Sequence, residues 1–395
     1  MLKGKTVLLG VSASIAAYKA AALASQLVKL HANVEVIMTK NATELIAPLS
    51  FEQLTGNRVS VDTFDRNFRH KVEHISLAKR TDLVIIAPAT ANVCAKLAHG
   101  LADDMLTTTV LACNCPKLIA PAMNTGMYEN PITQDNLNLL RRYGFLVIEP
   151  VEGMLACGDV GKGKMPEPEV LTENILRHIA RPHDLAGKKL LITAGPTCEA
   201  IDPVRYLTNR SSGKMGYALA RAALLRGAQV VLISGPTELA APLGAQLVNV
   251  ESAAQMFEKV KEYAADADMI FKAAAVADYT PAQYAHNKIK KADGDMAIAL
   301  NRTQDILAWL GQNAKPKQVI CGFSMETTDL LQNSKEKLIK KGVQMICANS
   351  LCEQGAGFGV DTNIITLITR DDTHTLPLLS KLDAAHAILD KALTL

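Results

Sequence analysis

The feature that most constrains the fold is a regular alternation of short apolar segments with longer helix-like stretches. In the first half, candidate strands occupy residues 6–9, 34–38, 83–87 and 117–120, and an alanine-rich stretch at 15–30 separates the first two. Such alternation is typical of βαβ units, in which helices cover both faces of a sheet of parallel strands. The sequence therefore predicts an α/β fold with a mostly parallel sheet.

The same pattern restarts near residue 187, where Gly187-Lys188-Lys189-Leu190 echoes Gly4-Lys5-Thr6-Val7. A predicted helix at 170–180 precedes the restart. Because 395 residues exceed the usual size of one domain, we predict two tandem Rossmann-like domains, residues 1–185 and 186–395, each a mostly parallel sheet with helices on both faces. The further candidate strands are 229–233, 269–272, 319–323, 344–348 and 363–368.

Composition and charge argue against nucleic acid and membranes as binding partners. A net charge of +3 is too small to favour nucleic acid. No apolar run reaches the roughly 18 residues that span a bilayer, and no signal peptide is evident. We therefore expect a cytoplasmic protein with no membrane partner and reduced cysteines. The spacing of its eight cysteines does not resemble a zinc site.

Small residues at 10–19 follow the first candidate strand and open a helix. Backbone N–H groups at a helix N-terminus can bind a phosphate, and the hydroxyls of Ser12 and Ser14 add hydrogen-bonding groups. The third glycine of the dinucleotide fingerprint is missing, and no acidic residue follows at the expected distance. This turn suits a mononucleotide, or is simply a tight turn without a ligand.

Three further positions in the first half carry polar or reactive groups. Asn124 follows a strand and should lie at the carboxyl edge of the sheet, unless it only caps its own backbone. Cys157 lies in a glycine-rich loop, a type of segment that often forms a lid. Its thiol, with an ordinary pKa of about 8.5, is protonated at neutral pH and can donate a proton. His74 precedes an apolar helix and could equally be structural.

Together these segments, over residues 3–180, resemble the flavin-dependent cysteine decarboxylase family. The resemblance implies a Rossmann-like subunit that assembles as trimers with FMN at the interface. It also implies His74 as the active-site histidine, Asn124 as the substrate-holding residue and Cys157 as the proton donor. The FMN-binding positions that it implies are Gly10, Ser12, Ser14, Thr39, Pro88, Thr90 and Asn92.

The reaction of that family explains why a flavin and a proton donor are needed. The flavin oxidises the cysteine thiol to a thioaldehyde, which accepts the electrons as CO2 leaves, and the resulting enethiolate is then protonated and reduced. This sequence departs from the family at Tyr128, where tryptophan is usual, and at Ala13, where glycine is frequent. Alanine would be strained at Ala13 if that position requires a positive φ.

The second half contains its own phosphate-binding pattern. Residues 209–216, Asn-Arg-Ser-Ser-Gly-Lys-Met-Gly, open a helix but lack the spacing of a Walker A loop. The alternative is a serine-capped helix with a surface lysine. Lys337 and Lys341 lie four residues apart on one predicted helix face, which suits a triphosphate or a merely solvated surface.

These motifs, over residues 186–395, resemble the phosphopantothenate–cysteine ligase domain. The resemblance implies CTP and Mg2+, with Asn209 acting on an acyl-cytidylate and Asp278 as a candidate metal ligand beside the CTP phosphates. Gln304 and Arg210 replace the proline and histidine usual in that family. The CTP-binding positions that it implies are Ala273, Ala274, Asp278, Lys288, Gln304, Asp305, Ile306, Leu307, Phe323, Lys337 and Lys341.

Both halves in this order resemble the bifunctional coenzyme A biosynthesis family. The implied substrates are 4'-phosphopantothenate, cysteine and 4'-phosphopantothenoylcysteine. The implied assembly is a homo-oligomer, a dodecamer if decarboxylase trimers combine with ligase dimers. Two alternatives are a chain with only one active half, and an NAD-dependent oxidoreductase, which the missing dinucleotide fingerprint disfavours.

Overall fold

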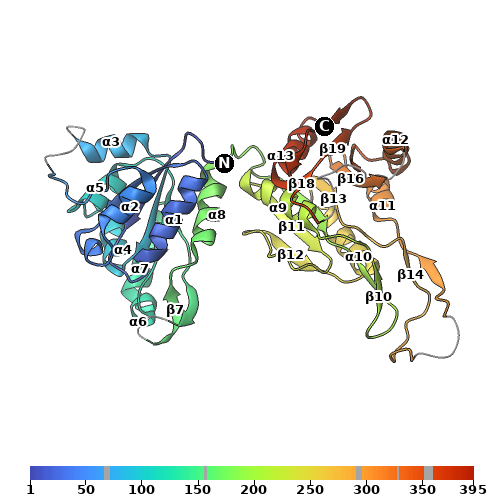
Figure 1. The fold of residues 1–395 in the computed structure, drawn as a ribbon, viewed down its shortest axis with the longest axis horizontal. Coiled ribbons are helices and arrows are strands. Elements are labelled where there is room, and N and C mark those ends of the chain that lie inside the picture. The colour runs from blue at the N-terminus through green and yellow to red at the C-terminus, as the bar shows by residue number, and fades with distance from the viewer. Residues whose placement is uncertain (66–71, 155–157, 291–295, 327–328, 351–358) are drawn as a thin grey trace. The chain divides into compact units, whose positions relative to one another are not determined.

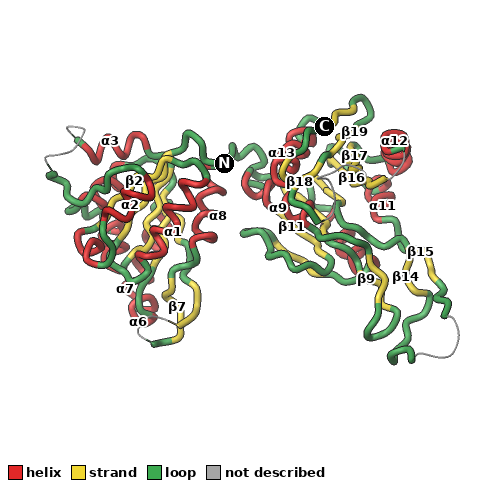
Figure 2. The backbone as a smooth tube through the Cα atoms, viewed as in Figure 1, coloured by secondary structure: helices red, strands yellow, loops and turns green. Residues whose placement is uncertain are grey.

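The computed structural model describes all residues except 66–71, 155–157, 291–295, 327–328 and 351–358. The chain divides into two compact units, Met1–Pro182 and His183–Leu395, and each has its own sheet and apolar core. Figure 2 shows helices flanking the strands of each unit. Within the described residues, no helix is both long and apolar enough to cross a membrane.

The N-terminal unit is built on a five-stranded sheet with the order β2-β1-β3-β4-β5, in which every neighbouring pair is parallel. A separate antiparallel hairpin, β6 and β7, follows it. Its strands are β1 Thr6–Val11, β2 Asn33–Met38, β3 Leu83–Ala89, β4 Lys117–Pro121, β5 Phe145–Val147, β6 Val151–Met154 and β7 Val160–Lys164. Its helices are α1 Ala17–Lys29, η1 Lys40–Glu44, α2 Pro48–Thr55, α3 Glu73–Arg80, α4 Ala91–Ala98, α5 Met105–Ala112, α6 Thr125–Glu129, α7 Pro131–Arg142 and α8 Pro168–Ile179.

The C-terminal unit contains an eight-stranded sheet with the order β12-β11-β8-β13-β16-β17-β19-β20. Its strands are β8 Lys189–Ala194, β9 Cys198–Ala200, β10 Tyr206–Thr208, β11 Gln229–Ser234, β12 Gln246–Asn249, β13 Met269–Lys272, β14 Tyr279–Pro281, β15 Leu300–Arg302, β16 Val319–Glu326, β17 Met345–Ser350, β18 Thr362–Asn363, β19 Ile365–Ile368, β20 Thr373–Thr375 and β21 Leu379–Ser380. Its helices are α9 Lys214–Leu225, α10 Ala253–Ala264, α11 Ile306–Gln312, α12 Leu330–Lys341 and α13 Lys381–Ala392.

Burial explains why these segments form central strands. Every residue of β3 is buried, as expected for a parallel strand covered by helices on both faces (Figure 1). The prediction of α/β units with mostly parallel sheets is confirmed. One predicted strand, 363–368, is divided: β18 pairs with β21, whereas β19 joins the main sheet antiparallel to β17.

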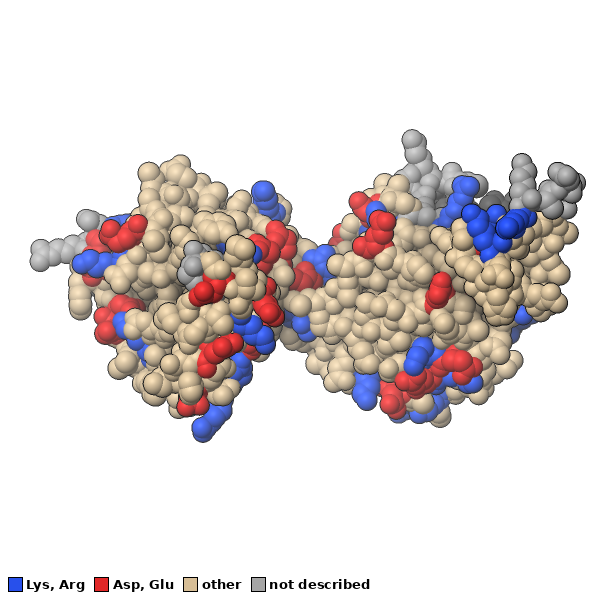
Figure 3. Space-filling model, turned by 90° about the horizontal axis from the view of Figure 1, so that it is seen from below, with Lys and Arg blue, Asp and Glu red and all other residues tan. Residues whose placement is uncertain are grey.

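The charged surface differs between the two units. On the face drawn in Figure 3, acidic and basic side chains are interspersed over the N-terminal unit, whereas basic side chains gather on one part of the C-terminal unit. The C-terminal unit therefore offers more local positive charge on this face than the net charge of +3 suggests.

Candidate functional sites

The predicted flavin residues of the N-terminal unit lie along one edge of its sheet. Thr39 follows β2, Ser12 and Ser14 follow β1, Thr90 follows β3, and Asn124 follows β4. Because these strands are parallel neighbours, their carboxyl ends meet at the same edge, and the strand order reverses beside β1. Ligands of open α/β sheets bind at such a switch point.

Ser12 joins the turns that follow β1 and β3. Its side chain is 1% exposed. The hydroxyl donates to the carbonyl oxygen of Pro88 at 2.9 Å and accepts from the backbone N–H of Thr90 at 3.0 Å. Ser12 therefore holds the shape of this edge and also lies close to any phosphate bound there.

Replacing Ser12 with alanine tests this structural role. Ser12→Ala should lower the free energy of unfolding of the N-terminal unit by about 1–3 kcal/mol, because the N–H of Thr90 loses its acceptor and the Pro88 carbonyl loses one of its two donors. Chemical denaturation measures the change, and retention of bound flavin on purification measures the local effect. Ser50→Ala, at an exposed position in α2, is the control. A loss no larger than that of the control would contradict the assignment.

A cavity of about 510 Å³, here called the N-terminal cavity, opens at this edge. No side chain caps the first turn of α1, although the hydroxyl of Ser14 accepts from the N–H of Ala16 at 3.4 Å. In that turn the N–H groups of Ala17 and Lys19 donate to the carbonyls of Ser14 and Ala16, so the Ser14 hydroxyl and the dipole of α1 are the groups that could hold a phosphate there. The cavity is lined by Ser14, Ile15, Ala16, Tyr18, Lys19, Ala122, Met123, Asn124, Met154, Gly163, Lys164 and Met165.

Asn124 links this cavity to the hairpin that carries the cysteine loop. Its Oδ1 accepts from the N–H of Gly126 at 2.8 Å, and its Nδ2 donates to Asp159 at 3.1 Å. Cys157 lies outside the described residues, between β6 and β7, and β7 packs against α6. The carboxamide of Asn124 thus lies where a substrate in the N-terminal cavity would meet this hairpin.

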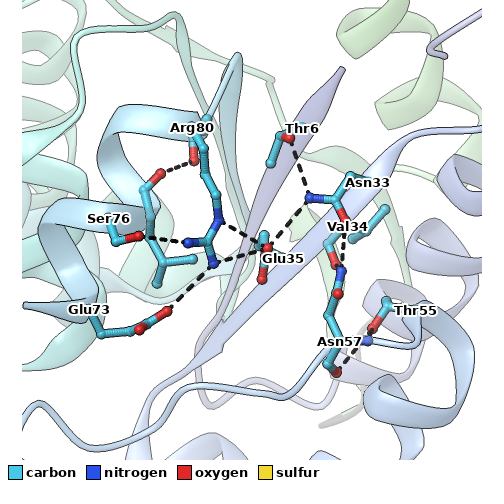
Figure 4. A network of polar contacts seen from close by, with 11 residues as sticks. Thr6, Asn33, Val34, Glu35, Thr55, Asn57, Glu73, Ser76 and Arg80 are labelled. Atoms are coloured by element: carbon cyan, nitrogen blue, oxygen red, sulfur yellow. Dashed lines mark hydrogen bonds and ion pairs between the residues drawn. The ribbon is translucent and has the colours of Figure 1, made fainter. Parts of the chain in front are cut away.

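His74 is not brought to this cavity. It lies on α3, which packs on α5, and Figure 1 places α3 at the opposite end of the unit from α6 and β7. Arg80 fixes α3 to strand β2: its guanidinium donates to Glu35 at 3.1 Å and to Glu73 at 3.5 Å (Figure 4). Within one chain, His74 and Asn124 therefore belong to different surfaces.

Other predicted positions on the N-terminal unit have clear packing roles. A Cβ on Gly10 would approach Leu106 to 2.6 Å, so glycine there allows α5 to pack against β1. Ala13 is not among the described residues with a positive φ, so alanine brings no strain. Asn92 is exposed in the first turn of α4. The Tyr128 hydroxyl donates to Glu149 at 2.6 Å, and burial, then Glu149, raises the pKa of Tyr128 to about 12.

In the C-terminal unit, a cavity of about 250 Å³, here called the C-terminal cavity, lies between the start of α9 and the ends of β13 and β16. Five predicted CTP residues line it: Ala273, Ala274, Asp278, Phe323 and Lys337. Its other lining residues are Ser211, Ser212, Gly213, Lys214, Met215, Gly216, Lys272, Ala275, Val276, Ser324, Met325, Asn349, Asn363 and Lys381. Four lysines and a single carboxylate favour an anionic ligand.

Two neighbouring lysines line one side of this cavity. The Lys272 ammonium donates to the carbonyl of Ala274 at 3.1 Å, and that of Lys337 donates to the carbonyl of Phe323 at 3.0 Å. Burial, and then the charge of Lys337, lowers the pKa of Lys272 to about 8. A bound phosphate would stabilise the charged form of Lys272 and raise its pKa again.

Asn349 also indicates a ligand. It is 8% exposed and lines the C-terminal cavity, yet its Oδ1 has no hydrogen-bond partner within the described part of the chain. Buried polar atoms are nearly always paired. The carboxamide can donate to a bound anion through its amide N–H groups and accept through Oδ1 from a donor elsewhere on a ligand.

Several predicted residues of the second half do not line this cavity. Asn209 is adjacent, since its Nδ2 donates to the carbonyls of Ala275 and Val276, each at 3.2 Å. Ile306 and Leu307 are buried in the core under α11. The remaining four are Lys288 and Gln304, both exposed, and Asp305 and Lys341, which form an ion pair with each other.

Sequence reasoning missed four cavity residues: Lys272, Lys381, Asn349 and Asn363. A charged residue that ends an apolar strand could have indicated Lys272, and the helix-opening pattern contained Lys214. Lys381, Asn349 and Asn363 carried no recognisable pattern. No cluster of three or more His, Cys, Asp or Glu side chains suited to a metal occurs among the described residues.

Both halves of the chain match known families. Residues 1–180 match the family described as "Flavoprotein", and residues 185–395 match "DNA/pantothenate metabolism flavoprotein C-terminal domain". The chain is 49% identical to the coenzyme A biosynthesis bifunctional protein CoaBC of Bacillus subtilis over 395 residues, which cover 99% of this chain and 97% of that protein.

Two solved structures are similar to one half each. The C-terminal domain of a coenzyme A biosynthesis bifunctional protein CoaBC is 44% identical, covers 53% of this chain and 96% of its own, and gives a TM-score of 0.46. A PPC decarboxylase variant complexed with pantothenoylaminoethenethiol is 34% identical, covers 43% of this chain and 96% of its own, and gives a TM-score of 0.40.

Proposed function

Because the chain belongs to the family of bifunctional coenzyme A biosynthesis proteins, we propose that it catalyses two consecutive reactions. The C-terminal unit ligates cysteine to 4'-phosphopantothenate at the expense of CTP. The N-terminal unit then decarboxylates 4'-phosphopantothenoylcysteine to 4'-phosphopantetheine with FMN. The observation that carries this proposal is the presence of two cavities, each at the carboxyl edge of its own parallel sheet and each lined by a different set of polar groups.

FMN fits the N-terminal cavity, because Ser14 and the start of α1 line it. Ser14 and the first turn of α1 would hold the phosphate, while Ser12, Thr39 and Thr90 shape the neighbouring edge of the sheet. When bound, FMN accepts two electrons from the substrate thiol and later returns them. The residues of this chain bind the substrate, exclude water and supply a proton.

Asn124 and Cys157 serve the substrate directly. The Asn124 carboxamide can hold the substrate by donating to its carboxylate and accepting from its amide. The Cys157 thiol donates the proton to the enethiolate. His74 reaches the site from a second copy of the chain, so we infer a homo-oligomer with the flavin at its interface. Trimers of the first half and dimers of the second would build a dodecamer.

In the C-terminal cavity, Lys272 and Lys337 bind the phosphates of CTP. A carboxylate is a poor electrophile, and its transfer to the α-phosphorus of CTP activates it for attack by the cysteine amine. Positive charge that is already in place stabilises the developing negative charge. Mg2+ would be held mainly by the CTP phosphates, with Asp278, the carboxylate that lines the cavity, as a candidate protein ligand.

The lowered pKa of Lys272 predicts a pH dependence. The free enzyme carries the Lys272 charge below pH about 8 and loses it above that value. The KM for CTP should therefore rise as the pH increases through about 8, which ligation kinetics can measure. Lys272→Met should raise this KM at low pH and remove the dependence, whereas Lys340→Met, on the exposed side of α12, should keep it. An unchanged profile in Lys272→Met would exclude Lys272 as the titrating group.

The proposed function is tested by one assay of the purified protein. It is given 4'-phosphopantothenate, cysteine, CTP and Mg2+, and the products are identified by mass spectrometry. We expect 4'-phosphopantetheine, CO2, CMP and pyrophosphate, and a Cys157→Ser variant that stops before the saturated thiol. A wild type that makes no 4'-phosphopantothenoylcysteine, and cannot decarboxylate it when supplied, would refute the proposal.

A further inference from the structure

One wall of the C-terminal cavity comes from the end of the chain. Asn363, which ends β18, and Lys381, the first residue of α13, both line the cavity. Lys381 is only 7% exposed, and its ammonium donates to the carbonyl of Val360 at 2.5 Å. A buried charge at this position needs an anion or a strong dipole nearby to offset its desolvation.

Lys381 lies beside a second lysine. Lys214, the first residue of α9, lines the same cavity and contacts Asp361 at 2.7 Å and the carbonyl of Gly359 at 2.9 Å. Burial, and then the charge of Lys214, lowers the pKa of Lys381. Asp361, whose side chain is 89% exposed, offsets only part of this charge. The pair Lys214 and Lys381 is therefore ready to accept an anion.

Backbone dipoles add to this positive charge. α9 is a twelve-residue helix whose N-cap, Gly213, provides no side-chain cap, so the first N–H groups of the helix face the cavity. Ser211 and Ser212 lie on the same wall. Asn349, which is 8% exposed, lines the same cavity, and its amide N–H groups are donors that can bind a phosphate oxygen.

The size of the cavity limits what can occupy it. Its 250 Å³ is below the roughly 300–1,000 Å³ of complete small-molecule sites, which suits one part of a substrate. The four lysines form two pairs by their contacts. Lys272 and Lys337 donate to carbonyls near the ends of β13 and β16, whereas Lys214 and Lys381 both contact residues 359–361. A short polyphosphate that runs from one pair to the other matches this shape and charge.

We propose that Lys214 and Lys381 bind the β- and γ-phosphates of CTP and stabilise pyrophosphate as the leaving group. The inference rests on the proposed ligase function. A carboxylate oxygen of 4'-phosphopantothenate forms a bond to the α-phosphorus. The bond from that phosphorus to the oxygen bridging to the β-phosphorus breaks, and this oxygen keeps the electron pair as pyrophosphate departs. The two ammonium groups, together with the start of α9, neutralise the charge that develops.

Product inhibition of the full-length holoenzyme tests this assignment. Inhibition constants for pyrophosphate and for CMP are measured in the ligation assay with Lys381→Met, Lys214→Met and Lys381→Arg. Both methionine variants should weaken pyrophosphate inhibition by about tenfold or more, because each loses a charge-assisted contact. CMP inhibition should stay within about twofold, because CMP lacks the phosphates concerned. Lys381→Arg should recover part of the effect, and Lys340→Met should behave as wild type.

The outcomes separate the two proposals. Unchanged pyrophosphate inhibition in both methionine variants would overturn the leaving-group assignment while the ligase function stands. Equal weakening of CMP and pyrophosphate in both variants would overturn it as well, because the lysines would then serve the whole nucleotide or the fold. A wild type without CTP-dependent ligation would instead remove the ligase proposal on which the inference depends. Lys214, whose side chain is 32% exposed, can be replaced without emptying the core.

Discussion

Two inactive variants, His74→Ala and Asn124→Ala, should restore decarboxylation of 4'-phosphopantothenoylcysteine when they form mixed oligomers. Asn124 lines the N-terminal cavity, whereas His74 lies on α3 and does not. If each site takes Asn124 from one copy and His74 from a neighbour, random assembly of the two variants leaves about a quarter of the sites intact. The variants would be co-expressed with different affinity tags, purified through both tags, and assayed for CO2 release.

The matched control replaces one partner with the double variant His74→Ala/Asn124→Ala. Co-expressed with His74→Ala, this chain contributes no histidine at position 74, so no site is complete and no activity should return. Mixed oligomers with no more activity than either variant alone would contradict a site shared between copies. Such a result would mean either that each site takes His74 and Asn124 from the same chain, or that one of these residues has no part in the reaction.

Local patterns predicted the scaffold and the sites that lie directly on it. Buried runs such as Leu83–Ala89 are apolar at every position except for Pro88, and this indicated parallel strands covered on both faces. Parallel strands place all their carboxyl ends at one edge, so Ser12 and Asn124 could be assigned to the same edge before the structure was known. The glycine and serine residues before α9 indicated a phosphate-binding wall in the same way.

The rest depended on contacts between distant segments. Lys381 and Asn363 reach the C-terminal cavity because β19 returns antiparallel beside β17 and α13 then follows, an arrangement that no short motif encodes. Ile306 and Leu307 were assigned to CTP by resemblance, yet their apolar side chains pack into the core. The position of His74 relative to Asn124 could not be predicted from the sequence, because the two residues lie on different surfaces of the N-terminal unit.

Asn209→Ala should abolish ligation while leaving decarboxylation intact. The Asn209 Nδ2 donates to the carbonyls of Ala275 and Val276, each at 3.2 Å, and so fixes the loop after β13 against the start of α9. Without this side chain, both carbonyls lose the hydrogen bond from Asn209, and the acyl-cytidylate loses an adjacent amide. We expect CMP formation to slow by roughly 100-fold or more, the loss typical when one donor to a transition state is removed.

Two comparison variants make this prediction specific. Asn209→Asp keeps the size but places carboxylate oxygens against two carbonyl oxygens, so it should fail like alanine. Asn313→Ala removes an exposed asparagine that donates to the carbonyl of Trp309 at 2.8 Å, and it should ligate normally. CMP formation and CO2 release from supplied 4'-phosphopantothenoylcysteine are measured on the same preparations. Near-normal ligation by Asn209→Ala, or an equal loss of decarboxylation, would show that Asn209 has no specific part in the ligase reaction.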